Sequence, residues 1–327
     1  MLSRLAIGSL EISPPLLLAP MAGITDLPFR SLAREYGAPL CFTEMVSAQG
    51  LIRDGKNTVT LLRSNAGDRP LGIQLFGEDP EALAEAARRV EHLCDVVDIN
   101  MGCPVKKVVS GGSGSALLRK PEAVAAILRA VRKAIRIPLT IKIRTGWNSG
   151  ETSFLEISRI AELEGCDAIT FHPRTRTQMF SEHADWDKLR ELKRASRIPI
   201  IGSGDIFSSR DIIAMFEKTG CDGVMVARGS LGNPWIFREA ADIMGGGKPH
   251  APTRAERHST VLKHLDSLRE LYGEQTAVRE MRKHLSWYVK GLAGAARFRS
   301  LCNTIGEIKE LREAVDAFFI GMDDENV

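Results

Sequence analysis

Eight short apolar runs, separated by longer segments of helical periodicity, constrain the fold of this chain more than any other feature. The runs lie at residues 16–19, 40–43, 71–76, 96–100, 139–143, 168–172, 198–201 and 223–226. Continuous apolar runs are typical of parallel strands that are buried on both faces. Residues 80–93 and 121–135 repeat apolar side chains at three- and four-residue steps, which predicts amphipathic helices. Eight such strand–helix units predict an α/β fold, a (β/α)8 TIM barrel.

A doubly wound parallel sheet is the alternative for such units, and it requires a GxGxxG turn after the first strand. The first run is followed instead by Pro20-Met21-Ala22-Gly23-Ile24-Thr25-Asp26. The nearest matches, which begin at Gly112 and Gly202, both lack the last glycine of the pattern. The sequence therefore favours the barrel.

The pattern changes after the eighth unit. Residues 245–252 read Gly-Gly-Gly-Lys-Pro-His-Ala-Pro, a composition typical of a linker. Thr253 stands three residues before Glu256, which predicts a capping box at a helix start, and residues 254–317 show helical patterns without strand signals. We therefore predict a catalytic barrel over residues 1–244, a linker over 245–253 and a small all-α domain over 254–327.

The composition of the chain narrows its class. The net charge of the 327 residues is only +3, so any nucleic-acid surface must be local. The six cysteines are widely scattered and form no CxxC pair, which favours a reducing compartment such as the cytoplasm. The sequence shows no signal peptide and no apolar run near the ~18 residues of a membrane helix, so we expect a protein that is neither exported nor bound to a membrane.

Polar residues gather where the eight predicted strands end. Barrel enzymes carry their chemistry on the loops that follow the strands, so these residues are expected to share one pocket. In chain order the ends carry Pro20-Met21-Ala22, Glu44, Gln74, Asn100 with Cys103, Lys142 with Arg144, His172 with Arg174, Ser203-Gly204-Asp205 and Ala227-Arg228-Gly229. The last two loops are the recurrent phosphate site of such barrels, which suggests a mononucleotide-type cofactor.

Cys103 is the reactive candidate among these residues. Pro104 restricts it to an extended backbone, so its side chain is held at the turn and not in a helix. An isolated cysteine is more often a small buried side chain without chemistry. The position of Cys103 at a strand end, among other polar residues, favours a functional thiol.

Five motifs along the chain carry a family resemblance. They are Ala19-Pro20-Met21-Ala22-Gly23-Ile24-Thr25-Asp26, Asp98-Ile99-Asn100-Met101-Gly102-Cys103-Pro104, Lys142-Ile143-Arg144-Thr145-Gly146-Trp147, His172-Pro173-Arg174-Thr175-Arg176 and Asn233-Pro234-Trp235-Ile236-Phe237. In this combination the chain resembles the bacterial tRNA-dihydrouridine synthase family, closest to its B type, from about Pro20 to Tyr288. The resemblance implies an FMN-binding barrel followed by a helical domain that helps to hold tRNA.

The resemblance also implies roles for individual residues. Cys103 would be the proton donor, and Asn100, His172 and Arg174 would face the uracil. The flavin-binding residues would be Pro20, Met21, Ala22, Gln74, Lys142, His172, Ser203, Gly204, Asp205, Ala227 and Arg228, the last five at the ribityl chain and phosphate. NADPH would be the reductant and tRNA the substrate, with neither a metal nor a membrane involved. The family usually has Asn at Ser203 and often Gly at Pro173, so Ser203 is expected to be a weaker flavin ligand than its neighbours.

The implied reaction explains why a thiol is needed. Hydride addition to C6 of uracil leaves an enolate over C5 and the C4 carbonyl, and an acid on the opposite face must protonate it. A thiol with a pKa of about 8.5 is largely protonated at neutral pH, so Cys103 would act as a neutral acid. Lys142, His172 and Arg174 would stabilise the developing charge on flavin or uracil oxygens.

A basic segment of the helical domain is predicted to contact RNA. Residues 279–299 hold six cations and one acid, and Arg282 and Lys283 are the predicted tRNA contacts. Lys106 and Lys107, beside the Cys103 loop, would extend this surface. The alternative is an ordinary solvated helix with aromatic residues in its core.

Two other functions fit part of the sequence. A flavin barrel that reduces a free pyrimidine, of the dihydroorotate or dihydropyrimidine dehydrogenase type, explains the barrel and the phosphate loops but not the basic helical domain. A tRNA-binding or folding factor with an incidental flavin is distinguished from an enzyme by whether product formation needs Cys103.

Overall fold

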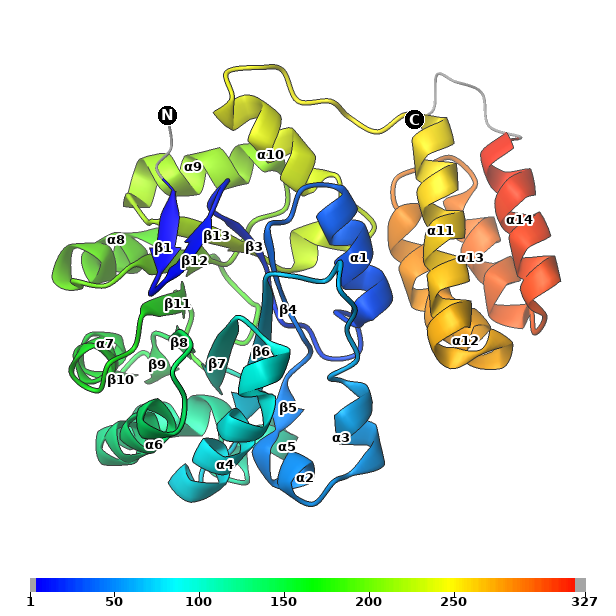
Figure 1. Cartoon of the computed structure of the whole chain (residues 1–327). Helices are drawn as coiled ribbons and strands as arrows, with labels where there is room; N and C mark the ends of the chain where they lie inside the picture. Colours follow the sequence, from blue (N-terminus) through cyan, green and yellow to red (C-terminus); the bar gives the residue numbers. More distant parts are fainter. Residues whose placement is uncertain (1–3, 321–327) are drawn as a thin grey trace.

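The eight apolar runs form eight parallel strands that close into a ring (Figure 1). The computed structural model describes residues 4–320. The strands are β3 (Leu16–Leu18), β4 (Leu40–Phe42), β6 (Leu71–Phe76), β7 (Val96–Met101), β8 (Leu139–Arg144), β11 (Ala168–His172), β12 (Ile200–Ser203) and β13 (Gly223–Val226). Because β4 pairs with both β3 and β6, the sheet has no free edge.

Helices follow the strands and cover the outside of the ring. They are α1 (Leu27–Glu35), α2 (Ala48–Ile52), α3 (Lys56–Thr60), α4 (Pro80–Val90), α5 (Lys106–Val109), α6 (Pro121–Ala134), α7 (Phe154–Leu163), α8 (Trp186–Ala195), α9 (Ser209–Thr219) and α10 (Ile236–Met244), with short 3₁₀ turns at Glu91–Leu93, Gly114–Arg119 and Arg228–Ser230. The helices α4 and α6 lie where the periodicity predicted them. Asp79 begins α4 by accepting hydrogen bonds from the N–H groups of Glu81 and Ala82, with Pro80 at the first helical position.

Three short pairings were not predicted. The hairpin of β1 (Leu5–Ile7) and β2 (Leu10–Ile12) buries Leu5, Ile7 and Ile12 in an apolar cluster with Leu17 and Phe42. The hairpin of β9 (Gly146–Asn148) and β10 (Glu151–Thr152) follows β8, and β5 (Val46–Ser47) pairs with β6 beyond β4. Strands of two or three residues are too short to show a two-residue alternation in sequence.

Four helices form the C-terminal part: α11 (Arg254–Tyr272), α12 (Glu274–Tyr288), α13 (Ala295–Thr304) and α14 (Ile308–Ile320). Their buried side chains, among them Leu265, Leu285 and Val315, form a second core cluster that also takes in Tyr36 and Trp235 of the barrel. The predicted fold class, a TIM barrel followed by an all-α domain, is confirmed. The predicted boundaries remain a proposal, and their ends at residues 1–3 and 321–327 lie outside the described residues.

The helical domain packs beside α1 and α10 of the barrel (Figure 1). The Tyr36 hydroxyl lies 2.6 Å from Thr260 Oγ1 in a buried hydrogen bond, and the Tyr36 ring packs against Trp235 with 5.5 Å between centroids. Arg238 donates two hydrogen bonds to Glu256 at 2.6 and 3.0 Å. Apolar and charged contacts therefore fix the domain on the side of the barrel that carries β3 and β4.

Two predicted details are wrong. The seventh strand begins at Ile200 and not at residue 198, because Pro199 has no N–H to donate to a neighbouring strand. The capping box at α11 is only half formed. Thr253 accepts a hydrogen bond from the Glu256 N–H at 3.2 Å, but the Glu256 carboxylate is bound to Arg238.

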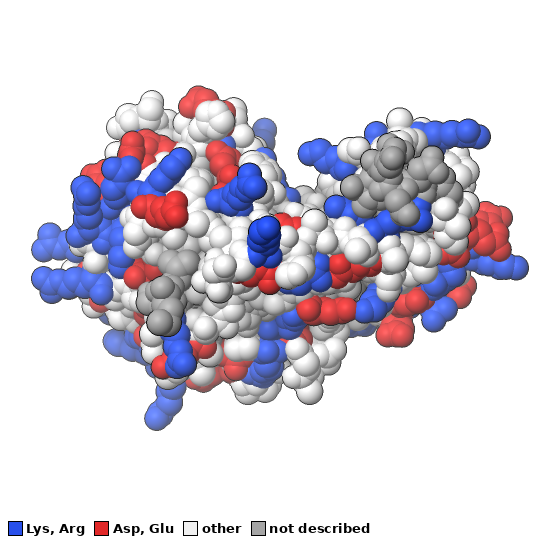
Figure 2. Space-filling model, turned by 90° about the horizontal axis from the view of Figure 1, so that it is seen from above, with Lys and Arg blue, Asp and Glu red and all other residues white. Residues whose placement is uncertain are grey.

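Within residues 4–320, no helix is long and apolar enough to cross a membrane. Seen from above, the barrel and the helical domain are two masses with a hollow between them, and basic and acidic side chains are mixed over most of this face (Figure 2). This face therefore has no large patch of a single charge. We expect the predicted nucleic-acid surface to be a smaller basic patch near the pocket.

Candidate active site

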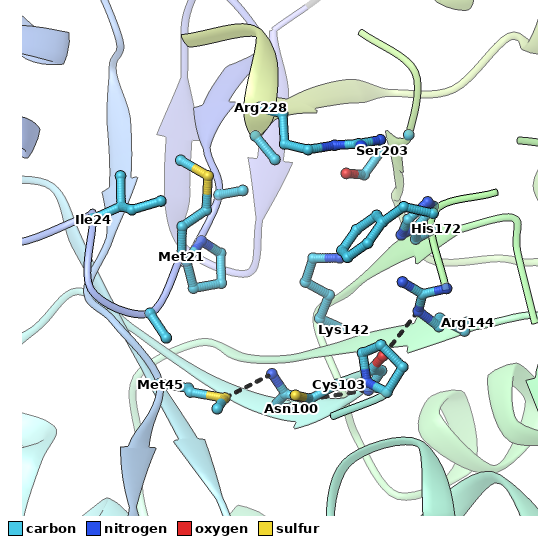
Figure 3. Close-up of a pocket in the computed structure, with 18 of the residues that line it drawn as sticks. Met21, Ile24, Met45, Asn100, Cys103, Lys142, Arg144, His172, Ser203 and Arg228 are labelled. Atoms are coloured by element: carbon cyan, nitrogen blue, oxygen red, sulfur yellow. Dashed lines mark hydrogen bonds between the residues drawn. The ribbon is translucent and has the colours of Figure 1, made fainter. Parts of the chain in front are cut away.

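A cavity of about 340 Å³ lies at the carboxyl ends of the strands. Residues of all eight strands, or of the loops that follow them, contribute to its wall. Figure 3 shows part of this lining, from Met21 to Arg228. The predicted site residues that line it are Pro20, Met21, Ala22, Gln74, Asn100, Cys103, Lys142, His172, Ser203, Gly204, Asp205, Ala227 and Arg228. This volume suits a small-molecule ligand.

Asn100 fixes the loop that carries Cys103. Its side-chain oxygen accepts hydrogen bonds from the N–H groups of Gly102 at 3.1 Å and Cys103 at 2.9 Å. Ser115 Oγ donates to the Cys103 carbonyl at 2.9 Å. With Pro104 next in the chain, the Cys103 side chain is held on the pocket wall (Figure 3). Burial is the main cause that raises the pKa of this thiol, so it is protonated at neutral pH.

A buried hydrogen-bond chain holds Asn100 in turn. Asn100 Nδ2 donates to Gln74 Oε1 at 2.7 Å, and Gln74 Nε2 donates to Asp98 at 2.7 Å. Thr140 donates to the other Asp98 oxygen at 2.6 Å. Burial raises the pKa of Asp98 to about 6 against the effect of these bonds, so the carboxylate is still ionised at pH 7. The network sets which way each amide points, since every donor faces an acceptor.

Lys142 places a cation on the pocket wall that pairs with no carboxylate of the described residues. Burial, with a smaller repulsion from Arg144, lowers its pKa to about 8. Its ammonium forms no ion pair or hydrogen bond with the described residues. Arg144 differs, because it donates to the carbonyls of Gly102, Thr175 and Met179 at 3.0, 2.9 and 2.8 Å. Arg144 thus joins two loops of the rim, while Lys142 remains free to meet a ligand.

His172 is neutral. Burial lowers its pKa well below the ordinary range, and Lys142 and Arg144 lower it further. Arg174 Nη1 lies 3.2 Å from His172 Nε2. Because a guanidinium only donates, Nε2 accepts and the ring proton is on Nδ1. His172 therefore enters the pocket wall as an uncharged group with an N–H to offer.

The loops after β12 and β13 bring backbone close to the cavity. Gly204 has φ +114°, and a Cβ there would lie 2.7 Å from His172 Cδ2. A Cβ at Gly229 would lie 2.3 Å from the carbonyl oxygen of Ile206. Arg228 stands at this end with its guanidinium 4.6 Å from the Phe180 ring centroid and 5.2 Å from that of Phe207. The arrangement offers close backbone approach and one cation, which suits a phosphate.

Comparison with known proteins identifies the family. The family described as dihydrouridine synthase (Dus) matches residues 17–321 of this chain. This chain belongs to the dihydrouridine synthase family. It is an enzyme, a flavin-dependent oxidoreductase, as the motifs predicted.

Similar proteins cover nearly the whole chain. A probable tRNA-dihydrouridine synthase of Rickettsia conorii is 36% identical over 98% of each chain. The tRNA-dihydrouridine synthase B of Pasteurella multocida is 39% identical over 96% of this chain and 95% of its own, and that of Pseudomonas aeruginosa is 39% identical over 97% and 96%. Histamine dehydrogenase from Rhizobium has the same fold, with TM-score 0.52 and 16% identity over 81% of this chain and 50% of its own.

Arg174 is not on the pocket wall. It is 2% exposed and lies behind His172, where Nη2 donates to both oxygens of Asp205 at 2.7 and 2.8 Å. It also donates to the carbonyls of Ser181 and Glu182 at 3.1 and 2.8 Å. Here Arg174 orients His172 and Asp205, and its predicted contact with uracil remains a prediction.

Arg282 and Lys283 lie on α12, outside the pocket. Arg282 donates to the Ile305 carbonyl at 2.9 Å, and Lys283 pairs with Glu280. Both side chains are half-buried, whereas Arg279 and Lys290 of the same segment are exposed. The assignment of Arg282 and Lys283 to tRNA remains a prediction.

Several residues of the pocket are not predicted as site residues by the sequence. Met45, Phe180, Phe207 and Leu231 line the cavity, and Phe180 and Phe207 are about half exposed. They lie in loops without periodicity, and isolated apolar residues there carry no signal of a site. The sequence places Arg144 at a strand end but predicts no role for it. Among residues 4–320 no group of His, Cys, Asp or Glu side chains is arranged to hold a metal ion.

We expect Gly204→Ala to lose bound flavin. The substitution places a Cβ against His172 at a backbone angle that L residues rarely adopt. Gly220→Ala is the control, because Gly220 has φ +69° with no atom within 4 Å of the added Cβ. Both variants should lose about 1–3 kcal/mol of stability through backbone strain, measured by urea unfolding. Only Gly204→Ala should lose flavin absorbance per protein, and equal flavin content in the two would contradict this role of Gly204.

Proposed function

We propose that this chain is a tRNA-dihydrouridine synthase that uses FMN and NADPH to reduce the C5=C6 bond of uridine in tRNA. Its family and the names of its relatives support this function. The observation that carries it is one cavity with a protonated thiol, Cys103, and an unpaired cation, Lys142. Because tRNA is made and used in the cytoplasm, we propose that the enzyme works there.

The residues present fit FMN. Lys142 has its ammonium on the pocket wall, Gln74 lies beside it with its amide bonded to Asp98 and Asn100, and the loop at Gly204 with Arg228 fits the phosphate end. Ser203, 3% exposed, adds only a short hydroxyl beside them. When bound, FMN supplies the hydride that NADPH delivers to the enzyme. A desolvated ammonium at Lys142 would favour negative charge on the bound group.

Cys103 is proposed as the acid. Hydride addition to C6 of uracil leaves negative charge over C5 and the C4 oxygen, and a proton must reach C5. The raised pKa of Cys103 keeps the proton on sulfur, and the Asn100 hydrogen bonds hold the loop in one geometry. His172, neutral and carrying a proton on Nδ1, would hydrogen-bond the base without adding charge.

One assay tests the proposed function and distinguishes it from the reduction of free pyrimidines. The purified protein should be yellow with FMN and should form dihydrouridine in unmodified tRNA when NADPH is supplied. Product is measured by mass spectrometry of digested tRNA. Reduction of free uracil or orotate without action on tRNA would favour a free-pyrimidine reductase and overturn the proposal.

Replacing Cys103 tests the acid directly. In Cys103→Ala, FMN content, NADPH-driven flavin reduction and tRNA binding should persist, while dihydrouridine formation falls by about 10²–10⁴-fold because the proton donor is lost. Cys166→Ala is the control, because Cys166 is buried and does not line the pocket. If Cys103→Ala makes product at the wild-type rate, Cys103 is not the acid, and a factor with an incidental flavin becomes the better description.

The affinity of the flavin-free protein for FMN should fall above about pH 8. The Lys142 cation is present below its lowered pKa of about 8 and is lost as the pH rises through it. If FMN binds only the cationic form, its Kd rises up to ~10-fold per pH unit above that point. Quenching of flavin fluorescence measures the Kd at each pH. Lys142→Met should bind FMN weakly, and its Kd should not change slope near pH 8. If the Kd of the wild-type protein varies with pH in the same way as that of Lys142→Met, the proposed contact is excluded.

A further inference from the structure

We propose that Arg119, Trp147 and Arg176, termed here the Trp147 cluster, bind the phosphate backbone of the RNA substrate on the rim opposite the helical domain. This inference rests on the proposed function and adds a second RNA surface to it. The cluster belongs to no predicted site, and none of its residues lines the cavity.

The barrel order places the cluster across the mouth from the helical domain. Around the ring the strands follow as β3, β4, β6, β7, β8, β11, β12 and β13. The helical domain packs on α1, which follows β3, whereas Trp147 follows β8 and Arg176 follows β11. In this ring of eight, β8 lies four positions from β3, and β11 lies four positions from β4. Figure 1 shows the β9–β10 hairpin on the far side of the barrel from α11–α14.

Trp147 holds two guanidinium groups at the surface. The Arg119 and Arg176 Cζ atoms lie 5.1 and 4.7 Å from the Trp147 ring centroid. Each such contact is worth about 0.5–1 kcal/mol at an exposed site, enough to orient a long side chain. The backbone is fixed as well: the N–H of Arg176 donates to the Gly146 carbonyl at 2.9 Å, and that of Thr177 donates to Trp147 at 3.1 Å.

The two arginines keep hydrogen-bond donors for a ligand. Arg119 pairs with Glu151 at 2.8 Å, but both side chains are about half exposed, so this pair holds the arginine only weakly. Arg176 is partly exposed and forms no ion pair with the described carboxylates, and its side chain donates no hydrogen bond to the described residues. Its Nε is buried, so the donors left for a ligand are the terminal amino groups. A planar, oriented guanidinium of this kind suits a phosphate better than a mobile lysine does.

The basic surface continues from the cluster to the Cys103 loop. The 3₁₀ turn Gly114–Arg119 packs against both β9 and α5. Lys106 and Lys107 on α5, together with Lys120, are exposed and unpaired within residues 4–320. The result is a run of cations beside the pocket with one aromatic ring among them, the pattern typical of nucleic-acid surfaces.

RNA fits this position better than an acidic protein does. When a nucleotide enters the pocket, the phosphates on both sides of it remain outside and contact the rim. Arg144, on the pocket wall, donates to the carbonyl of Thr175, the residue before Arg176. The Trp147 cluster therefore lies where the backbone on one side of an extruded base would pass, while the helical domain takes the other side.

The test uses the FMN-loaded full chain and unmodified tRNA at several salt concentrations. In Arg119→Ala and in Arg176→Ala, the slope of log K against log salt should become less steep by about 1, since one phosphate contact is lost. The KM for tRNA should rise while kcat at saturating tRNA stays near the wild-type value. Flavin content and NADPH oxidation without tRNA should be unchanged.

Arg129→Ala is the matched control, because Arg129 is an exposed arginine on α6 that pairs with Glu164 after α7 and does not line the cavity. It removes the same charge and should leave the salt slope unaltered. If the Arg119 and Arg176 variants bind tRNA with the affinity and slope of Arg129→Ala, the inference is overturned while the proposed function stands. Wild-type protein that neither binds nor modifies tRNA would overturn both. Competition by polyglutamate equal to that by a nonspecific RNA of the same charge would also overturn the assignment to RNA.

Discussion

Closing eight parallel strands into a ring forces all eight carboxyl ends onto one face, and the chemistry of this protein depends on that constraint. Met21 and Arg228 are separated by most of the barrel sequence, yet both line one cavity. No single strand supplies enough groups for a site. The hydrogen bonds from Asp98 through Gln74 to Asn100 run between neighbouring strands, so the position of Cys103 is itself a product of strand register.

The same enclosure sets the charge of the pocket. Burial raises the pKa of Cys103, lowers that of Lys142 to about 8 and lowers that of His172 well below its ordinary range. Each pKa shift favours the uncharged form of its group. The ordinary pKa values of cysteine, lysine and histidine differ widely, so the three groups still carry different charges at neutral pH. At neutral pH the thiol and the imidazole are neutral while Lys142 is still mostly a cation. One physical cause thus yields a positive pocket with a neutral acid in its wall.

Sequence reasoning succeeded where a residue's role follows from its place along a strand. The ends of the apolar runs located Gln74, Asn100, Lys142 and His172, and the structure places all four on one cavity. It was less informative where the role depends on a partner distant in sequence. Arg174 looked like a pocket residue, but Asp205, on another loop, holds it behind His172.

Contacts between residues distant in sequence also account for the other features that the sequence does not predict. The buried contact of Tyr36 with Thr260 had no signal, because each residue is ordinary within its own helix. The exposed Phe180 has no signal in the sequence either, because its contacts with the guanidinium groups of Arg228 and Arg144 exist only in the folded chain. Periodicity reports on local structure, and such side-chain pairs belong to the tertiary fold.

The buried contacts beneath the helical domain bear on how the substrate is chosen. Tyr36 and Trp235 lie in the same apolar cluster as Leu265 and Leu285, so moving the domain would expose this core to water. The buried cluster therefore opposes movement of the helical domain relative to Cys103. With the domain on one side of the mouth and the Trp147 cluster on the other, an RNA laid across both presents only one stretch of backbone to the pocket. On the proposed function, the position in which the RNA rests on these two surfaces selects the uridine that reaches Cys103.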